Sequence, residues 1–154
     1  MRKSQAKKLP LAPDSVYNDT QVTRFVNNLM WGGKKSAALT IFYDAMARIE
    51  KNTGEPGYEV WKRALVNVTP GVEVKSRRIG GATFQIPSEV RADRKISLSM
   101  KWLIRFSRER NGRSMADKLT NEIIAASKGE GAAYKKKEDT HRMADANKAF
   151  AHFR

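Results

Sequence analysis

VEVKSRRIGGATFQIP, residues 72–87, alternates branched or aromatic side chains with polar ones around a Gly80-Gly81 pair. Two alternating runs on either side of such a pair predict a β-hairpin with a two-residue turn. Nearly all of the remaining sequence carries helical patterns. Because an isolated hairpin is at best marginally stable in water, we expect the base of this one to rest on the helices.

The outer half of the predicted hairpin has no cleanly apolar face. In the register of a two-residue turn, Lys75 and Arg77 share one face with Phe84, while Arg78 and Thr83 lie on the other. We therefore expect this half not to lie flat on a core. Two interpretations stay open: a projecting arm that presents its basic residues to a partner, or an ordinary surface hairpin whose charges are solvated.

The charge of the whole chain favours the first interpretation, in which the basic residues bind a partner. Lys and Arg together number 30 against 16 Asp and Glu, which gives a formal net charge of +14. Such an excess opposes compact folding unless something neutralises it, and it is typical of nucleic-acid-binding proteins. Hydrophobic residues still make up 40% of the 154-residue chain, enough for one folded domain rather than a disordered basic tail.

Several other classes of function find no support. The chain has no cysteine and two histidines without metal-ligand spacing, so neither a disulfide nor a zinc site is predicted. Gly33-Lys34 lacks the earlier glycine and the following Ser or Thr of a phosphate-binding loop, and no other catalytic motif occurs. We expect no enzymatic activity, cofactor or small-molecule substrate. With no apolar run near the ~20 residues of a membrane span and no secretory signal, we expect a cytoplasmic protein without membrane contact.

Six helices are predicted around the hairpin. Most carry apolar residues at helical spacing, and the third places Trp61 in such a stripe, which favours a core position over base stacking. In the last, the apolar face (Tyr134, Met143 and Ala144) is weak, so this helix would pack loosely or be completed by a partner. The expected spans are about 20–30, 34–53, 56–69, 92–110, 114–128 and 132–147.

The chain thus reads as a mainly α, single-domain bundle with one projecting two-stranded arm and a basic N-terminal tail. Residues 1–18 form the tail, and residues 19–154 form the helical domain, with the hairpin arm at 72–87. The tail combines basic residues with Pro10 and Pro13, and such segments commonly run along a phosphate backbone.

Two further sets of basic residues suit phosphates. Lys34 and Lys35 begin a helix, where they oppose the helix dipole and would be favoured by an external anion. Four cations of the 92–110 helix share a narrow stripe opposite its apolar face, which fits a groove of phosphates. A charged stripe is also compatible with a merely solvated face. The stripe consists of Arg94, Lys101, Arg105 and Arg108.

Four segments of the sequence resemble those of one known family. They are residues 24–45 (RFVNNLMWGGKKSAALTIFYDA), the hairpin at 72–87, residues 101–116 (KWLIRFSRERNGRSMA) and residues 137–144 (KEDTHRMA). In this order, and without a large insertion, they resemble the bacterial form of the small-subunit ribosomal protein seven family over nearly the whole chain. The resemblance implies a bundle of six helices with a ribbon arm, and a structural protein rather than an enzyme.

The same resemblance implies partners and site residues. The family binds the 3′ major domain of 16S rRNA, nucleates assembly of the head of the small ribosomal subunit, and lies beside exit-site tRNA and mRNA. Small-subunit proteins nine and eleven are the expected neighbours, and some members repress translation of their own operon. Carried over by position, rRNA would meet Arg2, Lys3, Lys7, Lys8, Lys34, Lys35, Arg94, Lys101, Arg105, Arg108, Arg110 and Arg113. The arm residues facing tRNA or rRNA would be Lys75, Arg77, Arg78, Ile79, Gly80 and Gly81, and the last helix would face the exit site with Lys135, Lys136, Lys137, His141 and Arg142.

Two competing functions stay open on the residues alone. A general basic protein that compacts nucleic acid would bind duplex DNA as well as structured RNA. An RNA-modifying enzyme would need a substrate pocket, and no cluster of residues nominates one.

Overall fold

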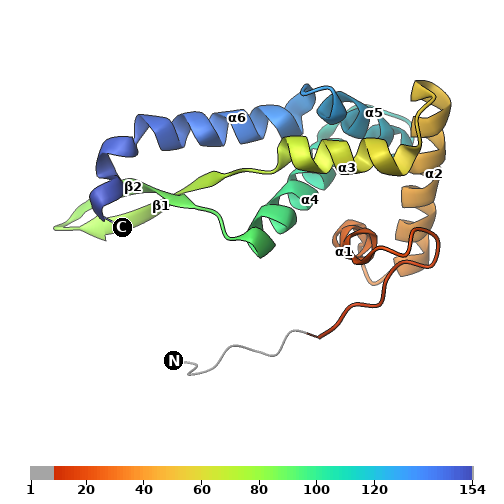
Figure 1. Cartoon of the computed structure of the whole chain (residues 1–154), viewed down its shortest axis with the longest axis horizontal. Helices are drawn as coiled ribbons and strands as arrows, with labels where there is room; N and C mark the ends of the chain where they lie inside the picture. Colours follow the sequence, from red (N-terminus) through yellow and green to blue (C-terminus); the bar gives the residue numbers. More distant parts are fainter. Residues whose placement is uncertain (1–8, 154) are drawn as a thin grey trace.

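The computed structural model describes residues 9–153 of the chain. Within that range the chain forms six α-helices and one two-stranded antiparallel sheet, and a short 3₁₀ helix follows the last α-helix, so the predicted mainly α fold with a single hairpin is confirmed. The elements are α1 (Thr20–Leu29), α2 (Lys35–Thr53), α3 (Gly57–Val68), β1 (Val72–Ile79), β2 (Ala82–Glu89), α4 (Ala92–Glu109), α5 (Met115–Ser127), α6 (Gly131–Ala146) and η1 (Lys148–Phe153). Helices α1 to α5 gather into a body, from which the hairpin and α6 extend side by side (Figure 1).

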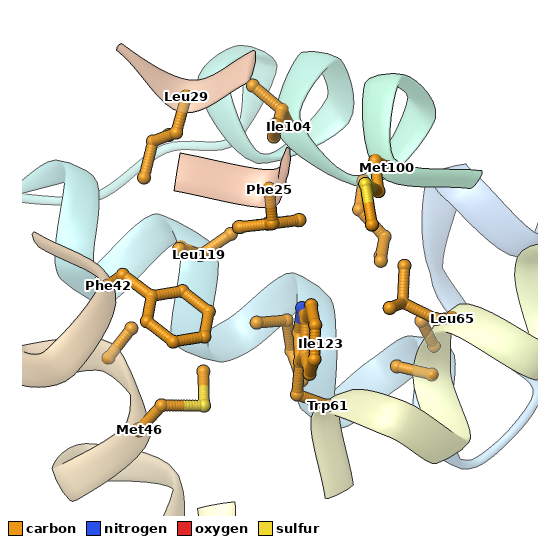
Figure 2. Close-up of a cluster of buried hydrophobic side chains, with 14 of the residues drawn as sticks. Phe25, Leu29, Phe42, Met46, Trp61, Leu65, Met100, Ile104, Leu119 and Ile123 are labelled. Carbon is orange, nitrogen blue, oxygen red and sulfur yellow. The ribbon is translucent and has the colours of Figure 1, made fainter. Parts of the chain in front are cut away.

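The core lies inside the helical body and centres on three aromatic side chains. Phe25, Phe42 and Trp61 come from three different helices and are 0% exposed. The Trp61 ring lies edge-on to both phenyl rings, with centroids 5.5 and 5.6 Å apart. Side chains of α4 and α5, among them Met100 and Leu119, close the cluster (Figure 2). The core position predicted for Trp61 is confirmed.

Local signals in the sequence set several helix ends. The Asp19 side chain accepts a hydrogen bond from the backbone N–H of Gln21 at 2.8 Å and caps α1. Ser114 Oγ caps α5 by accepting from the N–H of Asp117 at 3.2 Å. Gly54, at φ 72°, ends α2 in the left-handed conformation. These three boundaries agree with the sequence prediction.

The hairpin has the predicted two-residue turn. Gly80 and Gly81 have φ of 57° and 90°, a left-handed pair that L side chains rarely adopt, and Ile79 pairs with Ala82 across the turn. The base of the hairpin is supported by helices: both strands contact α6, Ile86 is 4% exposed, and Glu73 near the start of β1 pairs with Arg94 of α4. The predicted hairpin and its supported base are therefore confirmed.

The outer half of the hairpin extends past the body but does not stand alone. Helix α6 runs along β1, and η1 packs on β2 (Figure 1). The Phe84 and Phe150 rings lie with their centroids 5.3 Å apart. The sequence did not predict η1, so it presented the outer hairpin as more isolated than it is.

The packed face of α6 includes Ala144, as predicted, but otherwise overlaps the predicted face only in part. Its buried residues are Ala133, Thr140 and Ala144, whereas Met143 is 46% exposed. Small side chains at these positions let the helix lie close to its neighbours without a large apolar stripe. The expectation that Met143 belongs to the packed face is wrong, and the expectation of a weak stripe did not anticipate this close packing.

Candidate nucleic-acid interface

The N-terminal segment contacts the body from Ala12 onward, because the Ala12 carbonyl oxygen accepts a hydrogen bond from Thr23 Oγ1 at 2.8 Å. The Asp14 carboxylate accepts hydrogen bonds from the N–H groups of Val16 and Tyr17, each at 3.1 Å, and from the Tyr43 hydroxyl at 2.7 Å. Tyr17 stacks on Tyr58 with centroids 4.7 Å apart. Residues 14–18 therefore form an anchored turn rather than a continuation of the expected extended tail. The predicted phosphate contacts of Arg2, Lys3, Lys7 and Lys8 lie outside the described residues.

The stripe of four cations on α4 is exposed, but acids approach it. Arg94 Nε donates to Glu73 Oε2 at 2.8 Å, and Arg105 Nε donates to Glu109 Oε1 at 3.0 Å. Burial of the Glu73 carboxyl raises its pKa, but hydrogen bonds from Arg94 and Lys75 outweigh that effect and leave the pKa below its ordinary value. Part of the stripe's charge is thus compensated within the fold, which the sequence did not indicate.

The C-terminal end of the stripe opens into a groove. A concavity of about 540 Å³ lies where the end of α1, the start of α2 and the α4–α5 connection meet. Lys34, Arg108 and Arg113, which the sequence analysis assigned to rRNA from three separate segments, all line it. The fold therefore brings together predicted binding residues that are up to about 80 positions apart in the chain.

One aromatic side chain at this groove was not predicted to be functional. The sequence analysis assigned no role to Trp31, which follows α1, yet it is 78% exposed and lines the groove. The Arg108 guanidinium lies 5.1 Å from the centre of its ring. The available signal was a tryptophan placed outside any apolar stripe and next to basic residues.

Lys35 is the first residue of α2, and it is exposed. No side-chain hydrogen bond caps the N-terminus of α2, whose first turn contains no acid. Helix N–H groups at such an end attract anions. The phosphate contact predicted for Lys34 and Lys35 stays a prediction.

Arg110 has a structural position that its assignment to rRNA did not anticipate. Its guanidinium forms an ion pair with Glu122, whose side chain is 0% exposed. The other carboxylate oxygen of Glu122 accepts from the backbone N–H of Ala133 at 2.8 Å. Arg110 thereby joins the end of α4 to α5 and α6. Its side chain is 34% exposed.

The predicted residues of the arm are mostly accessible. Arg77, Arg78, Gly80 and Gly81 are exposed, and Ile79 beside the turn is half-buried. Lys75 lies nearer the base, where its Nζ is 3.3 Å from Glu73 Oε1. The arm thus presents arginines and a turn near its tip.

The predicted residues of α6 divide into outward and inward groups. Lys135 and Arg142 are exposed, and Lys136 is half-buried. The Lys137 side chain is only 18% exposed, with its Nζ 4.6 Å from the centre of the Tyr134 ring. His141 Nε2 accepts from the backbone N–H of Gly71 at 3.0 Å, so it ties α6 to the residue before β1. His141 therefore has an internal role in addition to its predicted exit-site position.

Other kinds of site were searched for in the described residues. Between residues 9 and 153, no cluster of three or more His, Cys, Asp or Glu is placed to hold a metal ion. Across the same range no helix is both long and apolar enough to cross a membrane.

Comparison with known proteins places the chain in a family. The model of ribosomal protein S7p/S5e matches residues 1–148. The chain is 64% identical over its full length to small ribosomal subunit protein uS7 of Cytophaga hutchinsonii, covering 99% of that protein. It is 64% identical to the protein of that name from Christiangramia forsetii and 57% identical to that from Phocaeicola vulgatus, again covering the whole chain and 99% of each relative. The chain therefore belongs to the ribosomal protein S7p/S5e family.

Proposed function

We propose that this protein binds the 3′ major domain of 16S rRNA and nucleates assembly of the head of the small ribosomal subunit. The groove that joins Lys34, Arg108 and Arg113 beside an exposed tryptophan is the observation that carries the proposal. On a chain of net charge +14, such a site combines phosphate-neutralising cations with a surface on which a base can stack.

Family membership gives the coarser part of this function. A member of the S7p/S5e family is a structural constituent of the small ribosomal subunit and not an enzyme, and in bacteria that subunit is cytoplasmic. Binding of rRNA and a role in translation follow from that membership. The head domain, the individual contacts and the neighbouring molecules belong to the proposal.

The arm and α6 supply the second part of the proposal. We assign Arg77 and Arg78 of the arm, with the turn between its strands, to the path of exit-site tRNA and mRNA, because both arginines are exposed and the hairpin extends past the helical body (Figure 1). Small-subunit proteins nine and eleven are the proposed protein neighbours, with the outward face of α6 turned to protein eleven. Repression of the protein's own mRNA is a further proposed role for the same basic surface.

A competition experiment tests this function. The full chain is bound to a labelled fragment of the 16S 3′ major domain and competed with unlabelled fragment or with duplex DNA. We expect the RNA fragment to compete far better than the DNA. If six to ten phosphates are neutralised, the affinity should also fall by about 10³- to 10⁵-fold between 50 and 200 mM salt.

Two results would contradict the proposal. Equal competition by duplex DNA would favour a general nucleic-acid-compacting protein, the alternative left open above. A nearly flat response to salt would mean that phosphate contacts do not supply the affinity.

A further inference from the structure

Two of the three tryptophans have opposite environments. Trp61 of α3 is 0% exposed, whereas Trp31, after α1, is 78% exposed. A large aromatic side chain gains most when it is removed from water, and Trp31 gains little of this within the protein itself. We therefore expect a ligand to occupy the groove and to cover this ring.

The loop that carries Trp31 has a defined shape. Gly32 and Gly33 have φ of 59° and 74°, and the backbone N–H of Lys34 donates to the Trp31 carbonyl at 3.2 Å. Two successive left-handed residues reverse the chain directly after the tryptophan, which keeps its ring out of the α1 stripe. The backbone of this loop thus places Trp31 in the lining of the groove.

Arg108 is held beside the same ring. Its Nη2 donates to the carbonyl oxygen of Leu29 at 3.1 Å, while the guanidinium carbon lies 5.1 Å from the Trp31 ring centre. The carbonyl fixes an otherwise flexible side chain, so the planar guanidinium and the indole are organised before any ligand binds. Guanidinium and aromatic planes are the two protein surfaces on which unpaired bases stack.

The groove has the size and lining that a nucleotide requires. Its volume of about 540 Å³ lies within the range of pockets that hold small molecules. Ile41 and Met115 give it an apolar wall, and Lys34, Arg113 and Lys118 add charge around it. An apolar slot with cations at its edge matches a base and its flanking phosphates, whereas a paired base inside a duplex has no free face to offer.

We propose that Trp31 and Arg108 form a stacking site for one unpaired base of the bound RNA, with Lys34 and Arg113 on its flanking phosphates. This inference rests on the proposed function and refines it by naming the state of the nucleotide. An RNA occupant is favoured over a protein one because the surrounding surface and the whole chain are strongly cationic.

The test uses the full chain and the 16S fragment, with substitutions that separate stacking from charge. Trp31→Ala should weaken binding by roughly 5- to 150-fold, the fold-change that corresponds to one lost base stack. Its salt dependence should match that of the parent, because no phosphate contact is lost. Trp31→Phe should restore much of the affinity, and Lys34→Gln should reduce the salt slope by about one contact instead.

Fluorescence gives a second readout. Stacking on Trp31 should quench part of the tryptophan emission when the fragment binds, and Trp31→Phe should abolish that part while binding persists. Val66→Ala is the matched control, because Val66 is a 73% exposed apolar residue of α3 outside the groove, and it should change neither affinity nor quenching.

The outcomes separate this inference from the function on which it rests. If the parent protein does not prefer the RNA fragment over duplex DNA, the proposed function fails and the stacking site fails with it. If the parent does prefer RNA, but Trp31→Ala binds it equally well and loses no quenching, only the stacking site is overturned. The groove would then be left to a protein partner.

Discussion

The helical body and the extension formed by the β1–β2 hairpin, α6 and η1 bury their side chains in different ways. In the body, Phe25 and Phe42 are 0% exposed and surrounded by other apolar side chains. In the extension, Phe84 is half-buried against Phe150, and α6 packs through small residues such as Ala144. Apolar burial therefore stabilises the body, whereas the extension depends on that body and leaves its charges for binding.

The largest expected difference between the two regions concerns their phenylalanines. Phe25→Ala should lower the free energy of unfolding by about 3–5 kcal/mol, because it leaves a cavity between α1, α2 and α3. Phe84→Ala removes one partly exposed ring contact and should cost about 1 kcal/mol or less. Urea unfolding of both variants measures the difference. Equal losses would mean that the extension shares the cooperative core of the body.

The junction between the two regions should give the next largest effect. Glu122→Ala leaves the Arg110 guanidinium and the Ala133 N–H without their buried acceptor. We expect a loss of about 2–3 kcal/mol in urea unfolding, with faster hydrogen exchange in α6, since breaking a buried pair is costly even where one partner is partly solvated.

A matched control for this variant is Glu109→Ala. Glu109 also pairs with an arginine, Arg105, but their side chains are 53% and 70% exposed. Removal of an exposed pair should change stability by no more than about 1 kcal/mol. If both substitutions cost the same, burial of Glu122 is not what makes the junction strong.

The sequence predicted local features and long-range contacts unequally, for a physical reason. Alternation, glycine pairs and caps such as Asp19 and Ser114 act over a few residues, so the hairpin, its register and most helix ends could be predicted from local pattern. Glu122 is an acid inside a helix, and only its distant partners on α4 and α6 explain its burial. The same holds for Trp31, whose significance depends on Arg108, some 77 positions away. Contacts of that range are not encoded in any periodicity.

Acid should weaken both regions through one carboxylate in each. Where the N-terminal segment is anchored on the body, burial of Asp14 raises its pKa, but hydrogen bonds from Tyr43 and from the Tyr17 and Val16 amides outweigh this and lower the pKa below its ordinary value. At the base of the hairpin, the pKa of Glu73 is lowered in the same net sense. A carboxylate with a lowered folded-state pKa stabilises the protein above its unfolded pKa of about 4, and this contribution disappears as the pH falls through the folded pKa.

We therefore expect the melting temperature to be steady above about pH 5 and to fall below about pH 4. Asp14→Asn and Glu73→Gln should each lower it near neutral pH and make its fall in acid shallower. Thermal unfolding followed by circular dichroism between pH 2.5 and 7 checks this. A variant with the same acid slope as the parent would show that the substituted carboxylate is not one whose pKa folding lowers.

The smallest effect on stability is expected from shortening the arm. Removal of Arg78, Ile79, Ala82 and Thr83 leaves Gly80-Gly81 as the turn between the paired residues Arg77 and Phe84. Two residues are lost from each strand, so the alternation of faces is kept and the closing pair is of the same hydrogen-bonding type as before. Three of the removed residues are exposed and the contact between Phe84 and Phe150 remains, so the stability should change by no more than about 0.5 kcal/mol.

What the shortened arm should change is behaviour at the proposed exit site. Because Lys34, Arg108 and Arg113 remain in the groove, the variant should still bind the 16S fragment and enter the small subunit. Retention of exit-site tRNA by subunits reconstituted with it should differ from that of the parent. A full-length chain with Arg77→Gln and Arg78→Gln separates the charge of the arm from its length. If this chain shows the same change in tRNA retention as the shortened arm, the arginines are responsible. If it retains tRNA like the parent, the length of the arm is responsible. Lost rRNA affinity with unchanged tRNA retention would instead make the arm an rRNA anchor, and the division between a binding body and an exit-site extension would have to be reversed.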